Sequence, residues 1–279
     1  MFEAALITVA VAVLLLGSLV WRLTPAPERR WMALFFLAAL PMSWLAYHEV
    51  RLPLDEWLKA QIGGGDFLAW LRTVYAPLTE EPAKLWPLLI AWLRWKVNHD
   101  NVARVAMALG LGFAVGEVFT VAGLVQEHQP KLAALPWYQL SGFMVERWMT
   151  CFIHSGLVAI SLAVWKRGPG LIPGLFLAMV AHYLANFPIT MAQRGWLGHS
   201  FVVSQTIVGL WLVGCCIAAV VLLVQLQCAP EKELPSTGKM KCPGCGRVYK
   251  RKWWNGFNFG ASRRYERCPW CNEWHWMGE

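Results

Sequence analysis

Charged residues are scarce in this sequence, which points away from a soluble globular protein. Only 15% of the 279 residues are Asp, Glu, Lys or Arg, whereas 57% are hydrophobic. Such a composition, with a mean hydropathy of +0.41, is typical of a membrane protein. The first residues also lack a basic segment and a cleavage site of small residues. We therefore expect the first apolar run to be a retained span rather than a signal peptide.

Long apolar runs, by contrast, recur along the chain. A transmembrane helix needs about 20 mostly apolar residues. Seven segments approach this length, at about 4–21, 31–47, 75–95, 102–126, 141–165, 171–190 and 201–227. We therefore predict an all-α polytopic membrane protein with about seven transmembrane helices in residues 1–228. The one long loop, 48–74, contains two amphipathic stretches that predict interfacial helices.

The distribution of basic residues predicts the orientation of these helices. The loops and tail on one side hold 18 of the 25 Lys and Arg residues, and the loops on the other side hold five. Basic residues concentrate in cytoplasmic loops, so we expect the N-terminus outside and the C-terminus in the cytoplasm. Ten of the 25 follow residue 228. This basic tail implies a cytoplasmic side or an anionic lipid surface before it implies nucleic acid.

Ionisable side chains nevertheless occur inside the predicted spans, where each charge costs at least about 2.5–3.5 kcal/mol on insertion scales. They come from four segments: Glu80, Glu81 and Lys84, then Glu117, then His154, then His182 and Asn186. With a helical rise of 1.5 Å per residue, the predicted topology places all four groups between the outer half and the middle of the bilayer. We expect them to line one polar cavity within a helix bundle, open to water from outside.

Each group taken alone also has a purely structural explanation. Glu80 and Lys84 have the favourable i,i+4 order of an ion pair at a helix start. Glu146 and Arg147 lie near the end of a span, where we expect them to snorkel or to pair locally. The deeper groups could be separate buried polar contacts. Unrelated contacts would not be expected to share one depth, which favours the common cavity.

At these positions the sequence resembles the PrsW-type glutamic intramembrane proteases. These belong to a wider group with the CAAX prenyl endopeptidases and the bacteriocin-processing enzymes. The motifs of that group, in order, are matched by Glu80-Glu81-x-x-Lys84, by His154 and by His182-x-x-x-Asn186. PrsW-like members also carry a Glu after a Gly- and Phe-rich segment and an Arg ahead of the His, which Glu117 and Arg147 match.

The resemblance covers residues 70–190 and departs from the family pattern at two positions. Val118 follows Glu117 where family members often have Asn, and Pro82 lies inside the first motif. The C-terminal extension lies outside the family core.

The resemblance implies an intramembrane endopeptidase in the plasma membrane of a prokaryote. Its substrate would be a membrane-anchored protein, such as an anti-sigma factor, and no catalytic cofactor is expected. Glu80 would be the general base and His154 would help to hold the water, while Glu81 orients the water site or Lys84. The other implied roles are oxyanion donors, for His182 and Asn186, and support of a histidine or a water, for Glu117.

Two alternatives remain open from the residues themselves. Glu80, Glu117, His154 and His182 are a plausible ligand set for zinc or iron, and a bound metal could equally activate water. The sequence lacks an HExxH motif, which counts against this reading. Intramembrane carboxylates and histidines also build proton relays, so an ion or proton transporter, or a membrane scaffold, is the non-enzymatic alternative. A relay should cross the bilayer, whereas these groups stop near its middle.

The C-terminal region predicts a second, small domain. Residues 229–240 form a polar linker, and residues 241–279 contain two Cys-x2-Cys pairs, Cys242 with Cys245 and Cys268 with Cys271. Four thiolates with this spacing predict a tetrahedral zinc site of the zinc-ribbon type. Four protein ligands leave no open position, so we expect a structural zinc ion. A cytoplasmic location also favours thiolates over disulfides.

The surface of this ribbon mixes basic and aromatic residues. The simplest explanation is a solvated basic face beside a small core. Docking on the headgroups of the lipid bilayer comes next, followed by capture of a protein partner. Nucleic acid is not expected as a partner, because no other signal in the sequence supports it.

Overall fold

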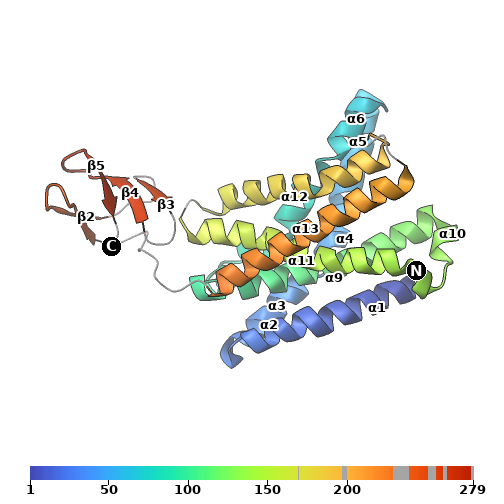
Figure 1. Cartoon of the computed structure of the whole chain (residues 1–279), viewed down its shortest axis with the longest axis horizontal. Coiled ribbons are helices and arrows are strands. Elements are labelled where there is room, and N and C mark those ends of the chain that lie inside the picture. Colours follow the sequence, from blue (N-terminus) through green and yellow to red (C-terminus); the bar gives the residue numbers. More distant parts are fainter. Residues whose placement is uncertain (169, 197–199, 229–238, 251–255, 260–262, 278–279) are drawn as a thin grey trace.

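The structure is a computed structural model that describes residues 1–168, 170–196, 200–228, 239–250, 256–259 and 263–277. The N-terminal part is helical and the C-terminal part is built from strands (Figure 1). Its helices run in the order α1 (Phe2–Ala12), η1 (Val13–Gly17), α2 (Ser18–Leu23), η2 (Ala26–Glu28), α3 (Arg29–Ala39), α4 (Met42–Leu45), η3 (Ala46–Arg51), α5 (Leu52–Ile62), α6 (Asp66–Arg72), α7 (Tyr75–Leu85), η4 (Trp86–Leu89), α8 (Ala91–Arg94), η5 (His99–Asn101), α9 (Val102–His128), α10 (Pro130–Ala133), η6 (Trp137–Leu140), α11 (Ser141–Lys166), α12 (Leu171–Gln193) and α13 (Phe201–Cys228).

Six helical stretches of the described chain are long and apolar enough to cross a membrane. They are Phe2–Leu23, Ala26–Ile62, Val102–His128, Trp137–Lys166, Leu171–Ala192 and Val202–Cys228. The chain therefore has the character of a multi-pass helical membrane protein. The second stretch is longer than predicted, because the helix continues from α4 through the π-helical turn η3 into α5. The predicted long loop thus begins only after Ile62, at glycines 63 and 65, which both have positive φ.

The predicted span 75–95 is not a continuous helix. It divides into α7, the 3-10 turn η4 and the single-turn helix α8, with Ile90 in an extended conformation between the last two. Pro87 supplies a physical reason, because proline has no N–H to donate within a helix and its ring crowds the preceding turn. Six rather than seven continuous membrane-length helices are therefore found in the described chain.

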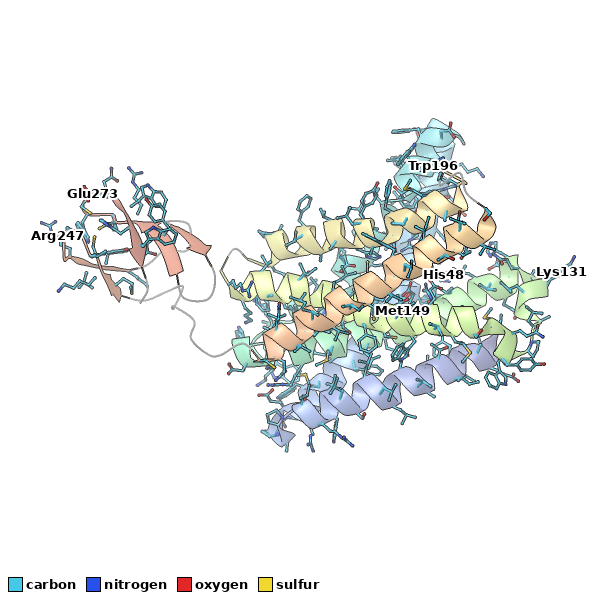
Figure 2. All side chains as sticks on the ribbon, in the orientation of Figure 1. His48, Lys131, Met149, Trp196, Arg247 and Glu273 are labelled. Atoms are coloured by element: carbon cyan, nitrogen blue, oxygen red, sulfur yellow. The ribbon has the colours of Figure 1, made fainter. Side chains whose placement is uncertain are left out.

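This broken segment nevertheless runs from one end of the bundle to the other. Near its start, the Ala69 carbonyl accepts a hydrogen bond of 2.7 Å from Arg194, just after α12 ends. At the same end, the ring of Trp196 (Figure 2) lies 4.7 Å from that of Trp70. Beyond its other end, the Val97 carbonyl accepts a hydrogen bond of 2.6 Å from Lys166, the last residue of α11. Residues 73–96 thus connect opposite ends of the helical part.

Helix α9 forms the centre of the bundle. Figure 1 shows α9 and α11 between α1 on one side and α12 and α13 on the other. Small residues explain the close packing, because a Cβ added at Gly110 would overlap the backbone of Ser155 on α11. A Cβ added at Gly112 or Gly116 would overlap the carbonyl oxygens of Phe36 or Leu40 on the α3 side. The glycine strip therefore lets α9 approach two neighbouring helices at backbone contact.

The C-terminal part contains two small antiparallel sheets. Strands β1 (Lys239–Lys241) and β2 (Val248–Lys250) pair with each other. Strands β3 (Gly256–Phe259), β4 (Arg263–Arg267) and β5 (Trp274–Met277) form the second sheet in the order β3-β4-β5. A buried hydrogen bond of 2.5 Å from the Tyr249 hydroxyl to Glu266 joins β2 to β4.

Candidate functional site

Glu81 is the fixed acidic group of a buried polar centre. It lies on α7, where its Oε1 atom accepts a hydrogen bond of 2.5 Å from Lys84, one turn further along the helix. The same oxygen is 2.5 Å from Nδ1 of His182 on α12. All three side chains are at least 95% buried. Since a buried charge needs a partner, the Lys84 ammonium balances Glu81, and the Glu81 oxygen orients the His182 ring.

Glu80 points to a different side of α7, as expected for consecutive helical residues about 100° apart. Its Oε1 atom accepts a hydrogen bond of 2.5 Å from Nη2 of Arg51, the last residue of η3. Its Oε2 atom lies 3.9 Å from Nε2 of His182. Oε2 is buried and has no hydrogen-bond partner among the described residues. One carboxylate oxygen is thus held by an arginine while the other remains available inside the bundle.

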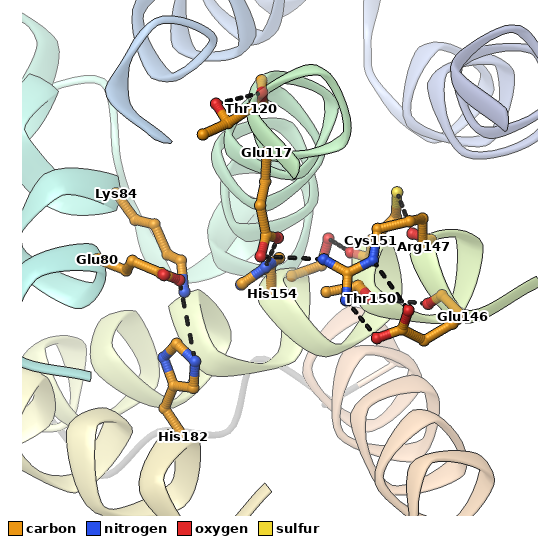
Figure 3. A network of polar contacts seen from close by, with 12 residues as sticks. Glu80, Lys84, Glu117, Thr120, Glu146, Arg147, Thr150, Cys151, His154 and His182 are labelled. Atoms are coloured by element: carbon orange, nitrogen blue, oxygen red, sulfur yellow. Dashed lines mark hydrogen bonds and ion pairs between the residues drawn. The ribbon is translucent and has the colours of Figure 1, made fainter. Parts of the chain in front are cut away.

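Glu117 and His154 form the second half of the centre (Figure 3). Glu117 on α9 places Oε2 at 2.6 Å from Nε2 of His154 on α11. Its Oε1 accepts a hydrogen bond of 3.1 Å from Arg147, which also pairs with Glu146. The Nδ1 atom of His154 is buried without a partner among the described residues. The local pairing of Arg147 with Glu146 was expected, and its second bond, to Glu117, ties this pair to the centre.

The two halves adjoin. A carboxylate oxygen of Glu80, a carboxylate oxygen of Glu117 and a ring nitrogen of His154 all lie within 4.8 Å of one another. The rings of His154 and His182 are 5.9 Å apart and nearly perpendicular. The centre therefore draws side chains from α7, α9, α11 and α12, which are far apart in the sequence. Buried polar atoms almost always have a partner. Glu80 Oε2 and His154 Nδ1 have none among the described residues, so each is available to a water molecule, a metal ion or a polar substrate group.

Asn186 is the predicted site residue that the structure does not bring into the network. It lies one turn after His182 on α12 and is half-buried. Its side chain makes no hydrogen bond within the described part of the chain, and only its backbone carbonyl accepts one, from Thr190. The other six predicted residues of the membrane centre, Glu80, Glu81, Lys84, Glu117, His154 and His182, lie together.

Arg51 is a residue of the centre that the sequence did not indicate. Sequence reasoning placed it in the loop 48–74, among the basic residues outside the spans. In the structure the helix continues through η3, and this brings Arg51 against Glu80 and within 3.2 Å of the Thr79 hydroxyl. No local motif signals this contact, which joins residues 29 positions apart.

The four cysteines of the ribbon lie together as predicted. Ligand atoms of Cys242, Cys245, Cys268 and Cys271 are all within 4.8 Å of one another. The Cys242–Cys271 and Cys245–Cys268 sulfur pairs are each 3.8 Å apart. This is too long for a disulfide, and it equals the edge of about 3.8 Å of a tetrahedron with zinc–sulfur bonds of about 2.3 Å. The four-thiol cluster is thus compatible with a zinc site.

Backbone geometry supports thiolates in this cluster. Each Cys-x2-Cys turn directs an amide N–H at the first sulfur, from Cys245 to Cys242 and from Trp270 to Cys268. Burial raises the pKa of the Cys268 thiol, but the amides of Cys271 and Trp270 lower it by more, so that it falls to about 7. The amide of Glu273 lowers the pKa of the Cys271 thiol, but burial and the neighbouring thiols raise it to about 12, so Cys268 is the thiol that the backbone favours as a thiolate. Deprotonated sulfur is the form that binds metal.

Comparisons with known proteins assign no family to this chain. No protein-family model matches the sequence. No curated protein and no solved structure is similar to it either. The interpretation of the polar centre therefore depends on the chemistry of its residues and on the motif resemblance alone.

Proposed function

We propose that the chain is an intramembrane endopeptidase that hydrolyses a peptide bond in a membrane-anchored protein. The observation that supports this best is the buried centre itself, in which a carboxylate oxygen without a partner, Glu80 Oε2, lies beside two histidines from other helices. Peptide hydrolysis needs a base to activate water and donors to stabilise the oxyanion. Both kinds of group are present there.

In this mechanism Glu80 Oε2 takes a proton from a water molecule held by His154. The resulting hydroxide attacks the peptide carbonyl carbon, and the proton passes to the departing amine nitrogen. His182 donates a hydrogen bond from Nδ1 to Glu81 and has Nε2 on the Glu80 side. In the imidazolium form, in which both ring nitrogens carry a proton, its Nε2 would donate to the oxyanion. Asn186 would join as a second donor only after a side-chain rotation, and Glu117 holds the His154 ring.

We further propose that residues 75–94 are the seventh membrane crossing, broken at η4. The segment joins opposite ends of the bundle, as a crossing must. The resulting odd number of crossings places the two termini on opposite sides of the membrane. With the positive-inside rule, the N-terminus is outside and the zinc ribbon is in the cytoplasm of a prokaryotic cell. The zinc ion of that ribbon is structural, and the substrate is an anchored protein of the anti-sigma-factor kind, cut near the outer face.

The test of the base assignment is Glu80→Gln, which keeps the shape of the side chain but removes the base. We expect membrane-protein fragments present in wild-type cells to disappear from cells that carry this variant, as measured by proteomics of membrane fractions. Glu56→Gln on α5, an exposed carboxylate, is the matched control and should leave the fragments in place. Purified variants should first show unchanged helicity and elution. Fragments that persist in the Glu80→Gln strain would reject the assignment.

A metal-dependent hydrolase is the second candidate, favoured by the mutual approach of Glu80, Glu117 and His154 within 4.8 Å. A metal held there would polarise water or a carbonyl. Metal analysis of the purified full chain separates the two mechanisms. If Glu80 acts as the base without a metal ion, we expect one zinc ion per wild-type chain, bound by the ribbon. The double variant Cys242→Ser with Cys268→Ser should then contain none. A metal ion that remains in this double variant, and that is lost after Glu117→Gln, would establish the metal-dependent mechanism instead.

A further inference from the structure

An apolar groove lies between the first helix and α3, separate from the candidate centre. It has a volume of about 510 Å³, and its floor is α9. Met32, Phe36 and Leu37 of α3 face Gly17 and its neighbours on η1 and α2 across it, and Leu111 of α9 closes its floor. Residues 13–24 border the groove and extend about 16 Å at the helical rise of 1.5 Å per residue. Its length and apolar lining therefore suit an extended hydrocarbon chain.

A half-buried guanidinium lies at one end of this groove. Arg29 belongs to the lining, and its guanidinium stacks on the ring of Trp21 at 4.7 Å. Its Nε atom donates a hydrogen bond of 3.2 Å to the carbonyl of Thr24. Among the described residues, Nη1 and Nη2 make no hydrogen bond or ion pair. These two donors have the geometry that binds a phosphate group in bidentate fashion.

The surroundings of Arg29 carry an excess of positive charge. The guanidinium of Arg30 lies 4.4 Å from the ring centre of Trp31, and the Lys96 ammonium lies 4.8 Å from the same ring. The adjacent carboxylate, Glu28, is already paired with Arg104 at 3.1 Å. Tryptophan rings beside basic residues are typical of the level of lipid headgroups. The charge at this end of the groove is thus complementary to an anionic headgroup.

We propose that the groove binds one anionic phospholipid. An acyl chain lies between α1–α2 and α3, and Arg29 and Arg30 hold the phosphate. The bilayer supplies acyl chains to any groove that faces lipid, so the apolar lining accounts for the binding of an acyl chain. The basic residues at one end account for the preference for an anionic headgroup. This site is independent of the proposed peptidase activity, because none of its lining residues belongs to the polar centre.

Native mass spectrometry of the full chain, extracted with phosphatidylglycerol and phosphatidylcholine in equal amounts, tests the proposal. We expect one retained phosphatidylglycerol. Gly17→Leu should remove it: a Cβ there meets Val13 and Leu111 at the ordinary distances of 3.6 and 4.0 Å, and the rest of the side chain fills the groove. Gly214→Leu on α13, where a Cβ meets nothing within 4 Å, is the matched control and should retain the lipid.

Arg29→Gln with Arg30→Gln tests the headgroup separately. We expect the preference for phosphatidylglycerol over phosphatidylcholine to fall about 25-fold, since each basic residue near the headgroups contributes about fivefold. Lys131→Gln on α10, at the opposite end of the bundle (Figure 2), should leave the preference unchanged. Equal retention of both lipids by the wild type overturns the proposal. So does equal retention of phosphatidylglycerol by the Gly17→Leu and Gly214→Leu variants.

Discussion

The two oxygens of Glu80 have different environments, and this difference defines the site. Oε1 is held by Arg51, whereas Oε2 is buried without a partner among the described residues. The pair is shielded from water, with 22% of the Arg51 side chain and 9% of the Glu80 side chain exposed. The guanidinium of Arg51 also lies over the ring of Tyr47, 5.5 Å from the ring centre. Arg51 thereby fixes the direction in which the free oxygen of Glu80 points.

A double-mutant cycle measures this contact. Arg51→Gln leaves Glu80 buried without its partner, so we expect it to lower the free energy of unfolding by up to about 3 kcal/mol. Adding Glu80→Gln should recover part of that loss, with a coupling energy on the order of 1–3 kcal/mol. Thermal unfolding in detergent provides the measurement.

The exposed pair of Arg72 and Asp55 is the control for this cycle. Its nitrogen–oxygen distance is 2.7 Å, close to that of the Arg51–Glu80 pair, but 48% of the Arg72 side chain is exposed. Arg72→Gln with Asp55→Asn should therefore show a coupling energy of at most about 1 kcal/mol. If the two cycles gave equal coupling energies, Arg51 would not have the positioning role described above.

At the scale of elements, the glycine strip of α9 decides how the polar groups meet. Gly110 lets α11 approach α9 at backbone contact near His154 and Ser155. Glu117 lies two turns further along α9, where it reaches the His154 ring. The distance between these two helices therefore sets the distance between the carboxylate and the imidazole.

Gly110→Ala tests this dependence. The new methyl group would overlap the Cα atom of Ser155, so the two helices must separate. We expect a loss of about 1–3 kcal/mol in the free energy of unfolding, as for other overpacked sites, and a weakened Glu117–His154 contact. Gly123→Ala on the same helix meets nothing within 4 Å. It should be neutral or stabilising by about 0.5–1 kcal/mol, because alanine favours the helix. Similar losses in both variants would show that the close contact with Ser155 is not the cause of the loss at Gly110.

At the scale of the whole molecule, one end of the bundle collects the basic residues. The end of α2, the segment after α8, the end of α11 and the end of α13 meet there in one apolar cluster, which includes Val20, Val97, Trp165 and Leu223. Arginines and lysines of the predicted cytoplasmic loops flank these elements. The ribbon follows from the same end, because α13 finishes there.

The predicted orientation can be measured with two epitope tags. A tag after Glu279 should be protected from added protease in intact spheroplasts and cleaved in inverted vesicles. A tag inserted at Gly64, in an open turn where a Cβ would meet nothing within 4 Å, should behave in the opposite way. These results follow from the excess of basic residues on the C-terminal side. Cleavage of the C-terminal tag in intact spheroplasts would reverse the assignment.

The sequence by itself determined the class of structure, because the deciding signals are local. Apolar length predicts helices that can span a membrane, and the structure has six such stretches in the described chain. Cys-x2-Cys spacing predicts the four-cysteine cluster, which the structure contains. The expectation that seven polar residues from four predicted spans share one place also came from sequence, through their common depth, and the structure brings six of them together.

Only the tertiary structure decided which atoms meet. The break of 75–95 at Pro87 and the continuation of the preceding helix to Ile62 depend on how these segments pack, and the local pattern misplaced both boundaries. The contact of Arg51 with Glu80 follows from that continuation. Asn186 shows the converse, since its i,i+4 spacing from His182 put it on the right helix face without giving it a partner. Helical periodicity fixes the direction of a side chain, but the approach of a neighbouring helix fixes what it touches.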